Sequence, residues 1–460
     1  MKAESLKQRW RERKKRIRPV TMIAGGFFLL IVLGTLLLML PISSRTGEAT
    51  GMLSAAFTAT SSVCVTGLIV VDTYQHWSTF GQVVILLLIQ IGGLGFMTVA
   101  AMFSLLARRS FTLRERMVMT ASLNVSDLAG VVRLTRSILK GTLLFEGIGA
   151  LILTIRFVPD FGLADGVYKG VFHSVTAFCN AGFDLMGSQG APFVSLTNFY
   201  DDPWVLTTIS ALIVIGGLGF FVWGDLYQNR RKPLKALSLH TKLVLATTSI
   251  LLVGGAALFY LYEADNPLTM GYMTESEKIF NAMFQSASTR TAGYNSFSQA
   301  YMTGPSQALT MILMFIGGSP GSTAGGVKTV TLAVLFITTK STFQGKKYPE
   351  VFHRSIGQKE IQNAVSIMMM GLCLVAVGSF IIADVEQVSF TQALFEAFSA
   401  FGTVGLTMGI TPNLGDVSRI TLIALMYLGR VGILTMGLMV FNRRALEPTI
   451  KYPEGKVLVG

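Results

Sequence analysis

Four short glycine-containing loops recur along this chain at nearly constant spacing. Their glycines stand 115, 111 and 112 residues apart, at Gly67 in CVTGL, Gly182 in CNAGF, Gly293 in RTAGY and Gly405 in GTVGL. A fixed period of this length indicates one structural unit repeated along the chain. The fold must therefore accommodate four equivalent loops.

The composition is that of an integral membrane protein. Of the 460 residues, 51% are hydrophobic and 14% are charged, a balance typical of chains with membrane-spanning segments. Eight apolar stretches are long enough to cross about 30 Å of hydrocarbon. They lie near 21–41, 79–106, 138–157, 204–224, 242–262, 307–339, 361–383 and 417–441.

A second set of apolar stretches is too short to span a bilayer. Each has about a dozen residues, where a spanning helix needs about 20. They precede the repeated loops, at 52–63, 167–178, 276–288 and 391–401. We therefore expect half-membrane or re-entrant helices at these four places.

Each unit thus contains an outer helix, a short pore helix, a loop and an inner helix. We predict an all-α membrane protein in which four such pseudo-symmetric helix–pore-helix–filter-loop–helix repeats surround one central pore. The expected parts are a cytoplasmic basic N-terminal arm (1–20), repeat 1 (21–106), repeat 2 with its preceding cytoplasmic linker (107–230), repeat 3 with a broken inner helix (231–340), repeat 4 (341–445) and a cytoplasmic C-terminal tail (446–460).

Alignment of the four units on their glycines supports the repeat. A bulky residue follows each glycine directly, and another precedes it by ten positions: Leu68, Phe183, Tyr294 and Leu406, then Phe57, Phe172, Met283 and Phe395. The string IGGLGF occurs in two inner helices, at 91–96 and 215–220. We expect the bulky side chains to anchor each loop.

The net charge of +13 is distributed along the chain in a way that favours a membrane orientation over a nucleic-acid partner. Basic residues fill the N-terminal arm and the connections at 108–116, 230–242 and 340–359, whereas the alternate connections are acidic. That alternation is the positive-inside pattern. It places both termini and the three linkers in the cytoplasm, with the basic arm beside anionic lipid headgroups.

The loops carry chemistry suited to a desolvated cation. Glycine accepts backbone angles that a β-carbon disfavours, so each loop can turn its carbonyls toward a common axis. Such carbonyls can replace the water shell of potassium, and the C-terminal ends of the short helices add partial negative charge. The simpler alternative is four ordinary turns, which also favour glycine. We predict that potassium is bound by backbone carbonyls of a filter made of Val65, Thr66, Gly67, Asn180, Ala181, Gly182, Thr291, Ala292, Gly293, Thr403, Val404 and Gly405.

The third inner helix contains the sequence IGGSPGSTAGGVKT at 316–329. Its proline and glycines cannot sustain a regular helix, and non-helical backbone at this depth is tolerated only beside a cavity or inside protein. We predict a flexible loop at 317–326 that obstructs the cavity and acts as a gate; the alternative is a fixed kink. A nucleotide-phosphate loop is excluded because Val327 separates the glycine from the lysine. The expected gate comprises Gly317, Gly318, Ser319, Pro320, Gly321, Ser322, Thr323, Ala324, Gly325, Gly326, Lys328 and Arg430.

Two arginines lie in apolar surroundings, where a charge is costly. Arg430 stands midway along the fourth inner helix. We interpret it as a cation near the inner pore that modulates passage or holds the gate, the alternative being an ion pair with Glu146 or Glu396. Arg290 precedes the third glycine, so we expect it to brace that loop from behind, with Glu396 as its partner.

The acidic residues and cysteines near the loops permit simpler interpretations. Asp72 and Asp184 follow their glycines and can concentrate cations at the outer mouth, although solvated carboxylates there would be ordinary. Cys64 and Cys179 each precede a glycine by three positions, and Cys373 lies in an apolar stretch. We expect buried small side chains; a disulfide between Cys64 and Cys179 is the alternative.

Several longer strings carry a resemblance that covers essentially the whole chain. They are SVCVTGLIVVDT at 62–73, IQIGGLGF at 89–96, TAFCNAGF at 176–183, RTAGYNS at 290–296 and FSAFGTVGLTMGITP at 398–412. With the broken third inner helix, these strings resemble the Ktr/Trk/HKT superfamily of potassium transporters. The chain is most similar to the membrane subunit of bacterial Ktr systems.

The resemblance implies more than the residues alone predict. It implies a homodimer in the cytoplasmic membrane, each subunit with its own pore, seated on a cytosolic ring of nucleotide-binding (RCK-type, KtrA-like) regulatory proteins. The loop at 317–326 would be the gate, with Arg430 as the fourth-helix arginine. Sodium would act as a stimulating ion beside the transported potassium, and glycine at Gly67 implies potassium rather than sodium selectivity.

Two other classes of function are weighed against this one. A sodium- or proton-coupled secondary transporter should show midplane charges and inverted repeats, whereas these repeats run in parallel and their loops are nearly uncharged. An enzyme needs a nucleophile–base pair or a metal cluster. The four histidines, His76, His173, His240 and His353, are scattered without ligand spacing, so we expect no enzyme and no organic cofactor.

Overall fold

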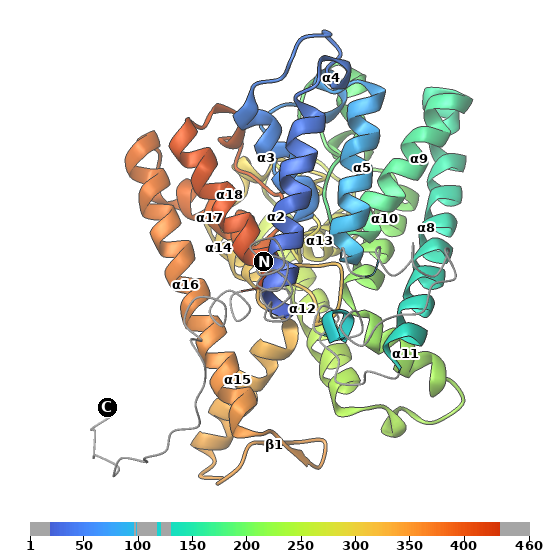
Figure 1. Cartoon of the computed structure of the whole chain (residues 1–460). Coiled ribbons are helices and arrows are strands. Elements are labelled where there is room, and N and C mark those ends of the chain that lie inside the picture. The colour runs from blue at the N-terminus through green and yellow to red at the C-terminus, as the bar shows by residue number, and fades with distance from the viewer. Residues whose placement is uncertain (1–18, 96–97, 99–116, 121–129, 433–460) are drawn as a thin grey trace, which may run out of the picture.

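The computed structural model of the chain describes residues 19–95, 98, 117–120 and 130–432 (Figure 1). In that part the protein is built from helices, apart from a small antiparallel hairpin of β1 (Glu350–Val351) and β2 (Arg354–Ser355). The predicted C-terminal tail, nearly all of the N-terminal arm, the whole of the first basic connection at 108–116 and the ends of the apolar stretches 79–106 and 417–441 lie outside the described residues.

One order of elements occurs four times: a long helix, a shorter helix, a glycine loop and an apolar helix. The long outer helices are α2 (Pro19–Leu38), α8 (Val131–Phe161), α12 (Leu239–Glu263) and α16 (Gln358–Glu386). The pore helices are α3 (Met52–Val63), α9 (Leu163–Phe178), α13 (Glu275–Ser288) and α17 (Phe390–Gly402). The inner helices are α5 (Thr79–Leu94), α10 (Pro203–Gly217), α14 (Gly304–Phe315) and α18 (Asp416–Val431). We number these units 1 to 4 in chain order.

The four outer helices are each long and apolar enough to cross a membrane, so the chain is an all-α membrane protein. Local sequence explains where two pore helices begin. Thr274 and Ser389 form capping boxes with Glu277 and Gln392, which satisfy the free amides of the first turn of α13 and α17. In unit 2, α9 has 16 residues and begins one turn before the predicted 167–178.

Bulky residues anchor the loops, with one correction to the aligned set. The side chains directly after the glycines are all buried: Leu68, Phe183, Tyr294 and Leu406. Ten positions before the glycine, Phe57, Phe172 and Phe395 are buried as well. The prediction for Met283 is wrong, because its side chain is 42% exposed and the neighbouring Phe284 fills the interior instead.

The inner helices are interrupted at one aligned position. α5, α10 and α18 end beside Gly95, Gly219 and Gly432, whose φ angles are 80°, 96° and 91°. These left-handed angles are accessible to glycine without steric cost. The expected unbroken span at 204–224 is therefore wrong, since α11 (Phe220–Gln228) leaves α10 at 90°.

The third inner helix is interrupted more widely. Between the end of α14 at Phe315 and the start of α15 (Thr329–Phe343), the chain forms no helix. The sequence predicted a break in this unit, and the proline and glycines of the segment explain it. This interruption is longer than the one in unit 2, where only Leu218 and Gly219 separate α10 from α11.

Three inner helices, α5, α10 and α18, pack directly on the pore helix of their own unit, whereas α14 packs on α17 of unit 4. A β-carbon added to Gly216 would overlap the carbonyl of Phe178, the last residue of α9. A β-carbon added to Gly92 would likewise overlap the carbonyl of Val63, and one added to Gly429 would overlap the carbonyl of Phe401. These glycines therefore let the inner helices approach the ends of the pore helices.

Gly216→Ala tests this close approach. We expect the added methyl to lower the free energy of unfolding by about 1–3 kcal/mol, as overpacking does. The control is Gly147→Ala on α8, where nothing lies within 4 Å of an added β-carbon. Thermal unfolding in detergent checks the pair, and equal midpoints for both variants would contradict the packing.

Candidate functional site

The four loops share an unusual backbone conformation. Their glycines have φ angles of 90°, 66°, 79° and 97°, in chain order. The residue two positions earlier is also left-handed in every loop: Val65 (51°), Asn180 (58°), Thr291 (77°) and Thr403 (52°). Left-handed residues at alternate positions turn successive peptide groups to one side of the chain. For the β-branched members this conformation is strained, and such strain is concentrated at functional sites.

The loops close into a ring in which each glycine faces the next loop. A β-carbon on Gly67 would lie 2.5 Å from the carbonyl oxygen of Ala181, and one on Gly182 would lie 2.5 Å from that of Ala292. Gly293 meets the carbonyl of Val404. The ring closes where Gly405 meets the carbonyl of Thr66 in the first loop. The structure thus brings all four predicted loops together, and their non-glycine side chains are fully buried.

The last turns of the pore helices hold the ring in place. Thr66, Ala181 and Val404 each donate a backbone hydrogen bond of 2.8 Å to a carbonyl five residues earlier. In units 1 and 4 a serine hydroxyl also accepts from the glycine amide, Ser61 at 3.0 Å and Ser399 at 3.1 Å. The loops therefore begin at the C-terminal ends of four helices, whose dipoles place partial negative charge there.

Two threonine hydroxyls of the ring are left without a partner. Within the described residues, the Oγ1 atoms of Thr66 and Thr403 are buried and form no hydrogen bond. A buried polar atom without a partner costs free energy unless something else satisfies it. A bound cation or its water could supply that contact.

A cavity of about 270 Å³ lies over the ring, lined by the four glycines and by Asp184. Asp184 accepts a hydrogen bond from the Met186 amide at 2.9 Å and is 8% exposed. Asp72 lies deeper in the scaffold, where it caps α4 (Thr73–His76) and accepts from the Phe193 amide at 2.8 Å. The interpretation of these two carboxylates as solvated groups is wrong, and only Asp184 lines the cavity.

The two charged groups behind the ring do not pair with each other. Arg290 is buried and its Nη1 lies 3.5 Å from the Thr248 carbonyl on the outer helix α12. Glu396 instead accepts from Thr407 at 2.5 Å and Thr411 at 2.6 Å. The expected Arg290–Glu396 pair is therefore wrong, and Glu396 braces the chain that follows loop 4.

The segment 317–326 packs directly against the ring. Gly325 lies against Thr403, and Gly317 lies against Thr291. Ser319 donates to the Gly217 carbonyl at 2.9 Å, which ties the segment to the end of α10. All the predicted gate residues of this segment therefore lie at one place, in a conformation held by backbone hydrogen bonds.

Arg430 fastens this segment to two inner helices. Its guanidinium donates to the carbonyl of Thr323 in the segment, and to those of Gly92 (2.5 Å) and Gly93 (3.1 Å) at the end of α5. Lys328 donates to the Ala324 carbonyl at 2.8 Å, so a second cation holds the same turn. The alternative in which Arg430 pairs with Glu146 or Glu396 is wrong. Glu146 instead accepts from Gln90 at 3.0 Å.

A second cavity, of about 490 Å³, lies on the other side of the segment and is lined by Pro320, Lys328 and Arg430. Glu360 and Asn363 of α16 also line it. Neither residue was predicted from the sequence. The one sequence feature that marks them is their polarity in the first turns of an otherwise apolar helix.

The cysteines are all free thiols. Cys64 and Cys179 are buried and Cys373 is exposed. Cys179 Sγ lies 3.6 Å from Oε1 of Gln90, outside the ring. The disulfide alternative is therefore wrong.

A bundle of membrane helices whose four re-entrant loops meet between two cavities has the architecture of a membrane transport protein. The sequence model of the family described as "TrkH: Cation transport protein" matches residues 6–446. The chain belongs to this family of cation transport proteins.

Similar proteins cover the chain almost completely. It is 44% identical to the potassium/sodium uptake protein NtpJ of Enterococcus hirae, over 97% of this chain and 98% of that protein. It is 40% identical to the Ktr system potassium uptake protein B of Bacillus subtilis, over 97% of each chain. The solved structure of the potassium transporter TrkH from Vibrio parahaemolyticus matches with a TM-score of 0.69 and 15% identity, over 91% of this chain and 85% of that one. That likeness shows the fold.

Tyr294→Phe tests the coupling between neighbouring loops. The Tyr294 hydroxyl contacts Thr176 Oγ1 and donates to the Phe183 carbonyl at 3.1 Å, so it joins loop 3 to unit 2. We expect its removal to lower the free energy of unfolding by about 1–3 kcal/mol, because buried partners lose a hydrogen bond. The control is Tyr301→Phe at a 59% exposed position. Equal thermal midpoints for the two variants would contradict this role.

Proposed function

We propose that the chain is the channel-like, ion-translocating subunit of a Ktr-type potassium uptake system in the cytoplasmic membrane. The observation that carries the proposal is the closed ring of four left-handed loops, in which each glycine faces the next loop's carbonyl. The names of the relatives support it, because several are called Ktr system potassium uptake proteins.

The chemistry of the ring favours potassium bound by main-chain oxygen. A bare cation in a buried site is unfavourable unless several ligands replace its water. Carbonyl dipoles of Thr66, Ala181, Ala292 and Val404 and their neighbours would supply those ligands. The twelve filter residues include no carboxylate, so selectivity would come from the number and spacing of carbonyls rather than from a ring of acidic side chains.

The orientation of the protein in the membrane would follow from its charge distribution. The described connections at 230–242 and 340–359 are basic and would face the cytoplasm under the positive-inside rule, as would both termini. The cavity with Asp184 would then be the outer mouth, where a carboxylate raises the local cation concentration. The cavity beyond the 317–326 segment would open to the cytoplasm.

The 317–326 segment and Arg430 would form the gate. The segment lies between the ring and the second cavity, and its position depends on a few hydrogen bonds to main-chain carbonyls. A cation moving along the axis would also meet the positive charges of Arg430 and Lys328. Displacing the segment would remove the steric barrier and break its bonds to Arg430 and Lys328.

The partners would be those of a Ktr system. We propose a homodimer on a cytosolic ring of RCK-type, KtrA-like nucleotide-binding proteins, with sodium as a stimulating ion and no organic cofactor in this chain. A cation secondary transporter coupled to sodium or protons is the second candidate. The observation that favours it is the name of the 44% identical relative, a potassium/sodium uptake protein.

Gly405→Ser tests the filter. We expect potassium-over-sodium flux to fall about tenfold or more, because a side chain here would meet the Thr66 carbonyl of the adjacent loop. Gly409→Ser is the matched control, since Gly409 has a similar φ of 90° but nothing within 4 Å of an added β-carbon. Ion flux into liposomes checks both, and unchanged selectivity in Gly405→Ser would remove the filter assignment.

Arg430→Gln tests the gate. Loss of the bond to Thr323 should raise potassium flux severalfold in the absence of any regulatory protein. Arg419→Gln on the same helix is the control, because Arg419 bonds the Pro412 carbonyl away from the segment. Deletion of residues 318–325 should also raise potassium flux in the absence of a regulatory protein. Flux that stays low in both gate variants, with protein correctly inserted, would place the gate elsewhere.

A further inference from the structure

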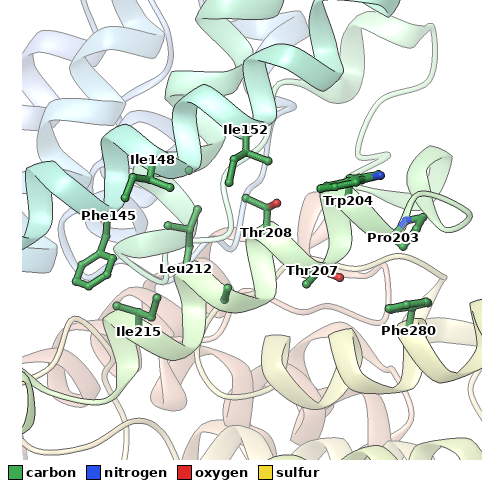
Figure 2. A pocket seen from close by; sticks show the side chains of 12 residues that line it. Phe145, Ile148, Ile152, Pro203, Trp204, Thr207, Thr208, Leu212, Ile215 and Phe280 are labelled. Carbon is green, nitrogen blue, oxygen red and sulfur yellow. The ribbon is translucent and has the colours of Figure 1, made fainter. Parts of the chain in front are cut away.

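An apolar groove runs along the seam between units 2 and 3. It has a volume of about 460 Å³ and is walled by α8, α10 and α13 (Figure 2). Ile148 and Ile152 approach from α8, Leu212 from α10 and Phe280 from α13. Ile148 is 49% exposed and Phe280 is 41% exposed, so the groove opens on the surface that faces the hydrocarbon. Its size is within the roughly 300–1,000 Å³ of small-molecule sites.

Two hydroxyl groups interrupt this apolar lining. Thr207 and Thr208 of α10 both line the groove. Several other membrane-helix threonines in this protein donate to the carbonyl one turn earlier, as Thr35 does to Ile31 and Thr338 to Val334, each at 2.8 Å, although Thr142 and Thr248 do not. Among the described residues, neither groove threonine has a side-chain hydrogen-bond partner. A hydroxyl in hydrocarbon without a partner is unfavourable, so the groove offers two donors to an occupant.

A charged cluster stands at one end of the groove. Arg156 lies one turn beyond Ile152 on α8 and bridges Asp160, at 2.8 Å, and Asp202, which caps α10. Arg156 and Asp160 remain 37% and 38% exposed. The cluster contains two carboxylates and one guanidinium, so an ammonium group is the better counter-ion. Trp204, 71% exposed beside it, is the residue type typical of the membrane interface.

We propose that this groove binds one phosphatidylethanolamine molecule from the leaflet on the pore-helix side. One acyl chain would occupy the apolar part between Phe145 and Ile152, and its ester carbonyl would accept from Thr207 or Thr208. The phosphate would face Arg156 and the ammonium would face Asp160. The order of apolar wall, donors and charged cluster matches the order of groups along a phospholipid. Phe145 and Arg156 are about 16 Å apart along α8, by the helical rise per residue.

This binding site would affect the ring through the helices that wall it. Leu212 packs on Gly149 of α8, and Gly149 also lies against Ser174 of the unit 2 pore helix. Phe280 belongs to the unit 3 pore helix itself. A lipid in the groove would therefore fill the seam behind two of the four loops.

Native mass spectrometry of the full-length protein with added phosphatidylethanolamine or phosphatidylglycerol tests the proposal. We expect one retained phosphatidylethanolamine per chain in the wild type, and at least tenfold lower occupancy in Ile152→Trp, which fills the groove. Ile250→Trp is the matched control, an isoleucine on α12 that is 71% exposed and lines no part of the groove. Asp160→Asn should reduce the preference for phosphatidylethanolamine about two- to fivefold, the range of an exposed ion pair.

A milder variant keeps the test informative if Ile152→Trp does not fold. Thr207→Val with Thr208→Val removes both donors at nearly constant volume and should also weaken retention severalfold. Equal retention in the groove variants and Ile250→Trp would overturn the proposal, and so would phosphatidylglycerol binding as well as phosphatidylethanolamine. The proposal would also be overturned if the wild-type protein formed a dimer without bound lipid and Ile152→Trp converted that dimer to a monomer. The groove would then be covered by a second copy of the chain.

Discussion

The contact between each repeated glycine and the next loop's carbonyl is the constraint on which the rest of the structure depends. A side chain at Gly67 or Gly182 would strike main-chain atoms of the neighbouring loop, so the ring closes only with glycine at these places. Closure in turn requires each pore helix to end close to the axis. The glycines of α5, α10 and α18 permit this, because they let the inner helices pack on the ends of the pore helices.

The third unit departs from this arrangement in a way that serves the proposed function. Gly317 stands where the inner-helix glycines of the other units stand, but it begins the non-helical segment. It lies against Gly325 of the same segment and against Thr291 of the ring. The segment therefore occupies the space beneath the ring that a continuous helix would leave open. Arg430 of unit 4, which also bonds the end of α5 in unit 1, and the end of α10 in unit 2 hold it there, so all four units contribute to one element.

The sequence predicted best where the signal is local or periodic. The glycine period located all four loops, and the unit 1 pore helix has the predicted bounds of 52–63. The left-handed conformation of the residue two positions before each glycine could not be predicted, because these four residues share no residue type that favours it. Valine, asparagine and threonine adopt that conformation there because the ring imposes it.

Tertiary contacts explain the predictions that were wrong. Arg290 and Glu396 were paired because they are opposite charges near the loops, yet hydroxyls of Thr407 and Thr411 satisfy the glutamate first. The break at Gly219 was hidden by the apolar residues on both sides of it. Met283 stands ten residues before its glycine like the other three bulky residues, but it is exposed. The next residue of α13, Phe284, is buried in its place.

The most direct test of the central claim is a density map of the protein prepared in rubidium or thallium, with difference density computed against a sodium sample. The account predicts a heavy-ion peak on the axis of the ring, at similar distances from the carbonyl oxygens of Thr66, Ala181, Ala292 and Val404. A ring without axial density, or a peak bound by side-chain carboxylates away from these loops, would contradict it.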